Sequence, residues 1–406
     1  MRILLAHTLY PTPNHPEILG GAETFAKQLC EALVVLGNDV GVVRCGPARE
    51  AWDTETVNGV EVSTLPVSNI YYPWAKRSFS PIERAAWHAI DDWTRPSREF
   101  ELIIDRFRPD VLHTNNLPGL TVALWQSAKR MGVPVVHTLH DYYLTCARSL
   151  RFSGGDRCEK TCASCRILTT RRRRASRLVD TVVSVSDRTL AIHKQHGLFE
   201  EKTRQVVIRN PPPKAGVAVK PVEDVERSTI FGFLGRSCEE KGIFELAAAI
   251  RNLPRDKAQL VIAGHVDAET KARVVREAGD AGIEFLGFVK PQQFFERIDV
   301  MVLPSLWEEP SPMVIGEAFA YGRPVVGSTR GGIPELISDE RAGWVFEPGE
   351  GRLAQLLAAI ANDRPGIIGK SEFLCGATTR RNFDDLVMEY ADVYRQADRS
   401  QGPQRD

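Results

Sequence analysis

The sequence has no apolar run near the length of about 18 residues that a membrane-spanning helix needs. It also has no net charge, since 52 Lys and Arg balance 52 Asp and Glu, so its charge gives no indication of a nucleic-acid partner. The first residues, MRILLAHTLYP, lack the small-residue cleavage site of a secretory signal. We therefore expect this stretch to be the first buried strand of a cytoplasmic protein.

Short β-rich runs alternate with helical patterns over most of the 406 residues, which is typical of parallel sheets covered by helices on both faces. Segment 209–226 interrupts the alternation with several prolines and no apolar period, and it predicts a linker. We expect an α/β fold of two Rossmann-like, doubly wound domains facing across a cleft, over residues 1–210 and 211–379. A last helix at about 380–397 is expected to pack back on the first domain, and the final residues are expected to fray.

The stretch EPSPMVIGE carries two acids around a predicted helix start, just after the apolar strand 300–303. Ser311 is the predicted N-cap and Pro312 the first helical residue, where its missing N–H matters least. The unpaired N–H groups of such a start suit phosphate, whereas the carboxylates of Glu309 and Glu317 suit sugar and ribose hydroxyls. The stretch favours a ligand that combines phosphate with a polyol, although a solvated loop acid and a helix-face acid explain it equally well.

In each domain, a glycine-containing turn is predicted to follow the first strand. In FLGRSCEEKG, Gly235 ends a strand, and Arg236 and Lys241 lie where both could reach a diphosphate. A solvated turn that enters a helix is the alternative. In LGGAE, Gly20 and Gly21 permit close approach of a ligand to the backbone, but a glycine pair is weak evidence alone.

The stretch VVHTLHDYY ends a predicted strand with His140 and Asp141, again at the expected cleft. A histidine there can donate a hydrogen bond to a sugar hydroxyl or to a departing oxygen. His113, at the end of PDVLH, has a similar position and receives less weight. A structural role is the alternative for both histidines.

Taken together, these motifs resemble the large family of retaining GT-B glycosyltransferases called family four, which use nucleotide-sugar donors. The resemblance covers nearly the whole chain and rests on the stretches GGAE, HD, VSVSD, VIRNP, FLGRSCEEKG and EEPSPMVIGEAFAYGRPVVGSTRGGIPELI. The last stretch is long and specific, whereas each of the others is weak alone. The resemblance implies transfer of a sugar to a glycan or lipid-linked acceptor, with retention, in polysaccharide or glycoconjugate assembly.

The resemblance also implies how the nucleotide-sugar donor is held. Arg236 and Lys241 would neutralise its diphosphate, and Glu317 would bind its ribose. The helix start can add two backbone N–H donors, from Met313 and Val314. No aspartate pair suited to Mg²⁺ stands at these motifs, so we expect no catalytic metal.

For the reacting sugar, the resemblance implies a contact with Glu309 and electrostatic assistance from His140. No residue is an obvious covalent nucleophile, which favours front-face substitution in which the leaving phosphate helps to deprotonate the acceptor. Two other functions stay open. One is a sugar-nucleotide epimerase of the same fold, and the other is a non-catalytic protein that binds nucleotides or glycans.

Four of the eight cysteines cluster in LTCARSLRFSGGDRCEKTCASC, an insert at about 144–166. Four thiolates at short spacing suit a structural Zn²⁺ ion, held by Cys146, Cys158, Cys162 and Cys165. Disulfides are disfavoured in a reducing compartment, and unligated or redox-active thiols are the alternative. We expect no catalytic role for this insert.

Directly after the insert, LTTRRRRASRL contains four successive arginines that would point to all sides of a helix. A run of charge is most often a solvated face. The resemblance implies that residues 1–210 form the acceptor-binding domain and residues 211–379 the nucleotide-sugar-binding domain. Beside the acceptor-binding domain, the arginines could hold the protein against anionic lipid headgroups, as suits a lipid-linked acceptor. The expected location is therefore cytoplasmic, with peripheral membrane contact as one hypothesis.

Overall fold

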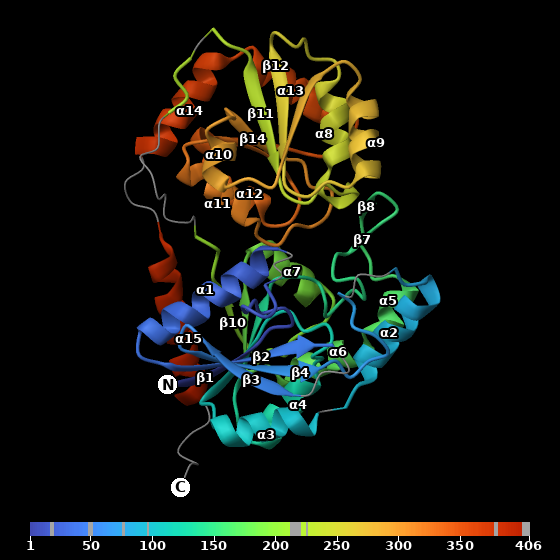
Figure 1. Ribbon diagram of the computed structural model, residues 1–406, viewed down its shortest axis with the longest axis vertical. Helices are drawn as coiled ribbons and strands as arrows, with labels where there is room; N and C mark the ends of the chain where they lie inside the picture. The colour runs from blue at the N-terminus through green and yellow to red at the C-terminus, as the bar shows by residue number, and fades with distance from the viewer. Residues whose placement is uncertain are drawn as a thin grey trace. The chain divides into compact units, whose positions relative to one another are not determined.

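The computed structural model in Figure 1 describes residues 1–16, 20–47, 52–74, 78–95, 97–211, 221–224, 226–376 and 381–399. The chain divides into two compact units. The first contains Met1–Arg151, Glu159–Arg209 and Asp384–Asp406, and the second contains Asn210–Phe383 together with the short segment Phe152–Cys158. Most of the predicted linker, at 212–220 and 225, and the final residues 400–406 lie outside the described residues.

The first unit is built on an eight-stranded sheet with the order β10-β9-β6-β5-β1-β2-β4-β3. All neighbouring strands are parallel except β3 and β4, which pair antiparallel. The strands are β1 (Arg2–Ala6), β2 (Asp39–Gly46), β3 (Asp53–Val57), β4 (Val60–Pro66), β5 (Val111–Thr114), β6 (Val135–Leu139), β9 (Thr181–Ser184) and β10 (Arg204–Val207). Because β1 lies between β2 and β5, the strand order reverses there, and the carboxyl ends of β1 and β5 form a switch point.

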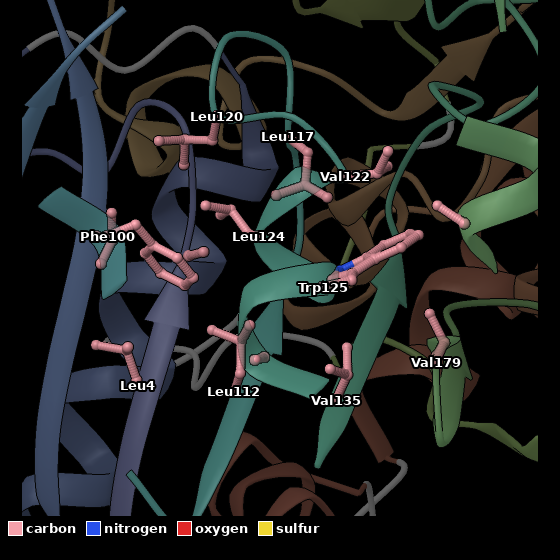
Figure 2. Close-up of a cluster of buried hydrophobic side chains, with 14 of the residues drawn as sticks. Leu4, Phe100, Leu112, Leu117, Leu120, Val122, Leu124, Trp125, Val135 and Val179 are labelled. Atoms are coloured by element: carbon pink, nitrogen blue, oxygen red, sulfur yellow. The ribbon is translucent and has the colours of Figure 1, made fainter. Parts of the chain in front are cut away.

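Helices cover this sheet, and serine side chains fix where several of them begin. They are α1 (Gly21–Val35), α2 (Pro81–Trp93), α3 (Arg98–Phe107), α4 (Ala123–Arg130), α5 (Ala163–Leu168), α6 (Thr170–Ala175), η1 (Ser176–Leu178), α7 (Asp187–Gln195) and α15 (Phe383–Arg399). At α2, the Ser80 hydroxyl accepts from the Glu83 N–H while the Glu83 carboxylate accepts from the Ser80 N–H, which forms a capping box. Figure 2 shows one buried cluster of this unit, in which Trp125 packs among leucines and valines.

The last helix, α15, belongs to the first unit although it follows the second in sequence. Its Tyr390 hydroxyl lies 3.2 Å from the Thr138 hydroxyl, and its Tyr394 hydroxyl lies 2.8 Å from Nδ1 of His113. The other ring nitrogen of His113 lies 2.8 Å from the Thr138 hydroxyl, so both nitrogens of this fully buried side chain are paired. His113 therefore holds α15 on the sheet and is structural.

The second unit is built on a six-stranded, wholly parallel sheet with the order β13-β12-β11-β14-β15-β16. Its strands are β11 (Thr229–Leu234), β12 (Ala258–Ala263), β13 (Gly282–Gly287), β14 (Val300–Leu303), β15 (Val325–Ser328) and β16 (Gly343–Phe346). This is the 3-2-1-4-5-6 order of a dinucleotide-binding fold, with its switch point between β11 and β14. The fold class predicted from the sequence, two Rossmann-like α/β halves, is confirmed.

The helices of the second unit bury an apolar cluster against each face of its sheet. They are η2 (Glu239–Lys241), α8 (Ile243–Ile250), α9 (Ala268–Ala278), α10 (Pro291–Phe295), α11 (Met313–Ala320), α12 (Ile333–Leu336), η3 (Glu340–Ala342), α13 (Arg352–Ala361) and α14 (Arg364–Gly376). Within the described part of the chain, no helix is both long and apolar enough to cross a membrane.

Two local features differ from the expectations. Helix α11 begins at Met313 with Pro312 as its N-cap, one residue later than predicted, because Pro312 has the extended ψ of 114°. The insert expected within the first domain contributes the hairpin of β7 (Phe152–Ser153) and β8 (Asp156–Arg157) to the second unit. The hairpin is held in the second unit by the Arg157–Glu308 contact at 3.0 Å, between residues 151 positions apart, which no local pattern contains.

Candidate active site

The switch point of the second sheet carries the glycine turn that follows β11. Gly235 has a φ of +146°, which side-chain-bearing residues rarely adopt, and no atom lies within 4 Å of the place where its Cβ would stand. Open space above a strand end allows a ligand to approach the backbone closely. The neighbouring Arg236 is exposed, and its guanidinium forms no ion pair with a described residue. Arg236 is therefore available to an anionic ligand.

Beside this turn, Lys241 and Glu309 form an ion pair. The Lys241 ammonium donates to Oε1 of Glu309 at 2.8 Å and to Oε2 at 2.6 Å. Oε2 also accepts from the Trp307 indole N–H at 2.9 Å and from the Ser305 hydroxyl at 3.1 Å. Glu309 is buried, with 6% of its surface exposed, so these donors replace the water that an ionised carboxylate would otherwise bind.

The geometry of this pair determines what each group can still bind. An ammonium has three protons, and Lys241 uses two of them on Glu309, which leaves one for a phosphate oxygen. Among the described residues, Oε2 of Glu309 accepts three hydrogen bonds, whereas Oε1 accepts only the bond from Lys241. Oε1 therefore has a lone pair available for a ligand hydroxyl.

Glycines bring the backbone around Glu309 close to two other segments. Gly331 has a φ of +61°, and a Cβ there would overlap the backbone of Glu309, whose carbonyl accepts from the Gly332 N–H at 2.8 Å. Gly242 has a φ of +73°, and a Cβ there would overlap the carbonyl oxygen of Pro304. Sequence analysis did not assign these glycines, although the RGG run after β15 was a usable signal.

Glu308 is a second buried acid that the sequence analysis missed. One of its carboxylate oxygens accepts from the Gly331 N–H at 2.8 Å, and the other pairs with Arg157 of the β7–β8 hairpin at 3.0 Å. Glu308 thus joins the loop after β14, the loop after β15 and the hairpin within one unit. The repeated acid in EEP was the only local signal for this residue.

The start of α11 presents the remaining predicted groups. No described residue accepts a hydrogen bond from the backbone N–H of Met313 or Val314, and Pro312 has no N–H. One turn into the helix, the Glu317 carboxylate is partly buried, and burial raises its pKa above the ordinary value. The described residues provide no hydrogen-bond donor to this carboxylate. Two free donors and one uncompensated acceptor thus lie on the first turns of one helix.

In the first unit, His140 follows β6, at the carboxyl edge of the sheet. Burial lowers its pKa to about 4, and its Nε2 has no hydrogen-bond partner among the described residues. The ring packs edge-on against Phe25 of α1, with ring centres 4.8 Å apart. The imidazole is therefore neutral at neutral pH, and it can act by hydrogen bonding rather than through a positive charge. Next to it, burial raises the pKa of Asp141 to about 7.

The same edge holds buried polar groups that the sequence analysis missed. His7 follows β1 and Asn115 follows β5, and none of their side-chain nitrogens and oxygens has a hydrogen-bond partner in the described chain. Nε2 of His7 lies 3.9 Å from the carboxylate of Glu23 on α1. The signal was their position directly after buried strands, the same signal that selected His140. Unpaired polar atoms at a switch point are typical of a site that binds a polar ligand.

Gly20 and Gly21 lie at the start of α1, where Gly20 is the N-cap with extended backbone angles. A Cβ on Gly20 would stand 3.5 Å from the carboxylate of Glu23, which is ordinary contact. Leu19 of the LGGAE stretch lies outside the described residues. The predicted ligand contact of the two glycines stays a prediction.

The structure brings together three of the four clustered cysteines, because Cys165 interacts with both Cys146 and Cys162. Sγ of Cys146 and Sγ of Cys165 are 3.9 Å apart, and the hydrogen bond from Cys165 lowers the pKa of Cys146 to about 5. Cys162 contacts the Ser164 hydroxyl at 3.2 Å, and Cys158 belongs to the second unit. No group of three or more His, Cys, Asp or Glu residues suited to a metal ion occurs in the described chain. Zinc therefore stays a prediction, which metal analysis of the purified protein can check.

Two doubly wound units with polar groups at both switch points make up the GT-B architecture, and solved glycosyltransferases share this fold. Residues 228–363 match the family model of group 1 glycosyl transferases, and residues 20–211 match that of the glycosyl transferase 4-like domain. The chain belongs to this family of glycosyltransferases. Catalysis of glycosyl transfer is thus its activity class.

One relative and two solved structures illustrate the similarity. The chain is 32% identical over 337 residues to an uncharacterised 42.6 kDa protein in the cps region of Klebsiella pneumoniae, covering 83% of this chain and 87% of the relative. Sucrose-phosphate synthase from Thermosynechococcus elongatus has a TM-score of 0.71 at 19% identity, over 97% of this chain and 98% of that one. Anabaena Alr3699/HepE, solved with UDP-glucose, has a TM-score of 0.68 at 17% identity, over 97% of this chain and 99% of that one.

Proposed function

We propose that the protein transfers a sugar from a nucleoside diphosphate to a glycan or lipid-linked acceptor, with retention, in polysaccharide or glycoconjugate assembly. The observation that carries the donor class is the start of α11, where two N–H groups and the carboxylate of Glu317 have no hydrogen-bond partner among the described residues. Phosphate and ribose are the complementary ligand groups. A protein of similar fold, Anabaena HepE, has been solved with UDP-glucose, which supports the same class. The relative in a cps region supports the acceptor class.

In this proposal the donor lies along the carboxyl edge of the second sheet. Its diphosphate contacts the N–H groups of Met313 and Val314, the Arg236 guanidinium and the third proton of Lys241. The two ribose hydroxyls donate to Glu317, which relieves the desolvation of that carboxylate. A hydroxyl of the transferred sugar donates to Oε1 of Glu309.

The proposed reaction breaks the bond between the anomeric carbon and the diphosphate oxygen and forms a bond from that carbon to the acceptor oxygen on the same face. The acceptor proton passes to the leaving phosphate. Arg236, Lys241 and the dipole of α11 stabilise the charge that develops on the diphosphate. The neutral imidazole of His140 assists by hydrogen bonding, and no catalytic metal is proposed.

A thermal-shift screen against UDP, GDP, ADP and dTDP, with and without attached sugars, tests the donor class. A ligand at about 100 times its dissociation constant adds about 2.7 kcal/mol of stability, which raises the melting temperature measurably. The expected result is selective stabilisation by one nucleotide, which Glu317→Gln reduces by about half and Glu372→Gln, a control at an exposed helix residue, retains in full. If none of the nucleotides stabilises the protein, the donor proposal fails.

Incubation of the matching nucleotide sugar without acceptor separates transfer from epimerisation. A transferase leaves the sugar configuration unchanged and releases the nucleotide slowly by hydrolysis, whereas an epimerase converts the donor to its epimer. Appearance of an epimer would overturn the proposed transfer.

A further inference from the structure

The first unit has a surface cavity of about 670 Å³, and His7, Asn115 and His140 are not among the residues that line it. Four arginines line it, one from the segment after α2 and three from α6 and η1: Arg95, Arg171, Arg174 and Arg177. Trp93, the last residue of α2, also lines the cavity and exposes 61% of its surface. The other lining residues are Gln126, Ala175 and Leu178, so no acidic side chain takes part.

The arginines of the cavity keep most of their positive charge available. Arg177 lies 3.7 Å from Glu200, but 70% of its side chain is exposed, so this ion pair is weak. Arg171 donates to the carbonyl of Trp93 at 2.8 Å and lies over the Trp93 ring, and neither contact neutralises its charge. Within the described part of the chain, Arg95 and Arg174 form no ion pair. The cavity is therefore strongly cationic.

A buried ion-pair network fixes this arrangement. Arg172, fully buried between the half-buried Arg171 and Arg173, pairs with Asp91 of α2 at 2.8 Å. Asp92 accepts from the backbone N–H groups of Arg171 and Arg172, each at 3.0 Å. Arg172 thus anchors α6 to α2. The preceding residue, Arg171, lies over the Trp93 ring.

An apolar stripe on α2 continues from the cavity. Ile82, Ala86, Ile90 and Trp93 recur at helical spacing on one face, away from the buried Trp87 and Asp91. Ile82 exposes 82% of its surface and Ile90 36%. Helix α5, which packs against α2, adds Ile167 with 69% exposed. Exposed isoleucines and tryptophan next to arginines are typical of a surface that lies at a membrane interface.

We propose that this surface, the α2 stripe together with the arginine cavity, binds the protein to an anionic lipid membrane. The arginines contact headgroup phosphates, for which guanidinium is suited by its fork of donors. Trp93 and the isoleucines enter the boundary between headgroups and acyl chains. The charge of the cavity selects this occupant over an apolar protein partner, because an apolar interface would have to bury four guanidinium groups, of which only Arg177 has an acidic partner among the described residues. The inference does not depend on the proposed transfer reaction.

Cosedimentation of the full chain with vesicles tests the proposal without measuring activity. Vesicles of phosphatidylcholine alone are compared with vesicles that contain phosphatidylglycerol, at low and high salt. The triple variant Arg95→Gln, Arg174→Gln, Arg177→Gln removes three exposed charges, and Lys257→Gln, Lys271→Gln, Arg276→Gln removes three exposed charges from the second unit as a matched control. Trp93→Ala with Ile82→Ser tests the apolar stripe.

Each basic residue near an anionic surface contributes about fivefold to binding, so the arginine variant should bind anionic vesicles on the order of a hundredfold more weakly. The apolar variant should also bind more weakly, and the control variant should bind as the unchanged protein does. Equal binding to neutral vesicles, equal loss in the control, or no binding at all would overturn the proposal. Stabilisation by inorganic phosphate that depends on the arginines, without vesicle binding, would assign the cavity to a soluble phosphate ligand and would also overturn it.

Discussion

Both carboxylate oxygens of Glu309 accept hydrogen bonds from the Lys241 ammonium, at 2.8 and 2.6 Å, although the two residues are 68 positions apart. The pair lies between a glycine turn after β11 and the loop after β14, with Trp307 and Ser305 as further donors to Glu309. The sequence analysis expected Lys241 to contact the donor diphosphate and Glu309 to contact the reacting sugar. Their direct contact means that a change in either one alters the other.

Glu309→Gln should lower the rate constant of transfer by at least about a hundredfold while nucleotide affinity changes only severalfold, because the proposed contact of Glu309 is with the reacting sugar. The amide also leaves the Lys241 charge without its anionic partner, so the unliganded protein should lose stability by about 1–3 kcal/mol. Transfer kinetics, nucleotide titration and urea unfolding measure the three quantities. Loss of nucleotide binding with normal transfer would contradict the role given to Glu309.

Glu317→Gln should change stability and binding in opposite directions. Burial raises the pKa of Glu317, and the described residues give its carboxylate no hydrogen bond, so a neutral amide of the same shape relieves a desolvation penalty. The unliganded variant should therefore be as stable as the unchanged protein, or more stable, near neutral pH. Its affinity for nucleotide should fall about tenfold, because the ribose hydroxyls lose an ionised acceptor. A variant that is less stable and binds nucleotide normally would show Glu317 to be structural.

The fold was predictable because both sheets are built from continuous apolar runs bounded by turns. The predicted strand 300–303 is β14, and its residues are fully buried on both faces as a central parallel strand requires. The predicted start of α11 was one residue too early, for a specific reason. Proline fixes φ but not ψ, and the extended ψ of 114° at Pro312 makes it the N-cap instead of the first helical residue.

Only those residues of the candidate site that directly follow buried strands could be predicted from chain position. Gly235, Arg236 and His140 follow buried strands, and chain position alone selects them. Partners far away in the sequence carry no such signal. His113 occupies a similar position, yet a tyrosine 281 residues later pairs with its second nitrogen, which makes it structural. The same limit applies to Lys241, whose carboxylate partner became visible only in the structure.

Gly331→Ala should damage the site through the backbone of Glu309. A Cβ at position 331 would overlap that backbone, and the φ of +61° adds strain. We expect a loss of several kcal/mol in stability, or a displaced Glu309 and a large loss of transfer. Gly351→Ala is the matched control, because Gly351 has a φ of +73° and its Cβ would meet only the tip of the Gln355 side chain, 4.0 Å away. The control should lose only about 1 kcal/mol. Equal losses in the two variants would show that backbone strain, and not the overlap with Glu309, is responsible.

Acid should unfold the first unit through its buried histidines. Burial lowers the pKa of His7 and His137 to about 3 and of His140 and His193 to about 4, and it holds the pKa of His113 well below its ordinary value. In the unfolded chain these groups titrate near 6.5. The unfolded state therefore binds more protons below that pH, so the contribution to stability is complete above pH 6.5 and is lost as the pH falls toward 4.

Asp141 acts with the opposite sign, because its raised pKa of about 7 favours the folded state at low pH and this contribution is lost as the pH rises from about 4 to 7. One carboxyl cannot offset five histidines, so the free energy of unfolding should fall between pH 6.5 and 5, by about 1.4 kcal/mol per pH unit for each proton taken up. Urea unfolding across this range measures the slope, and His140→Gln should reduce it by about one proton. A free energy of unfolding that stays constant from pH 7 to 5 would contradict the burial of these neutral imidazoles.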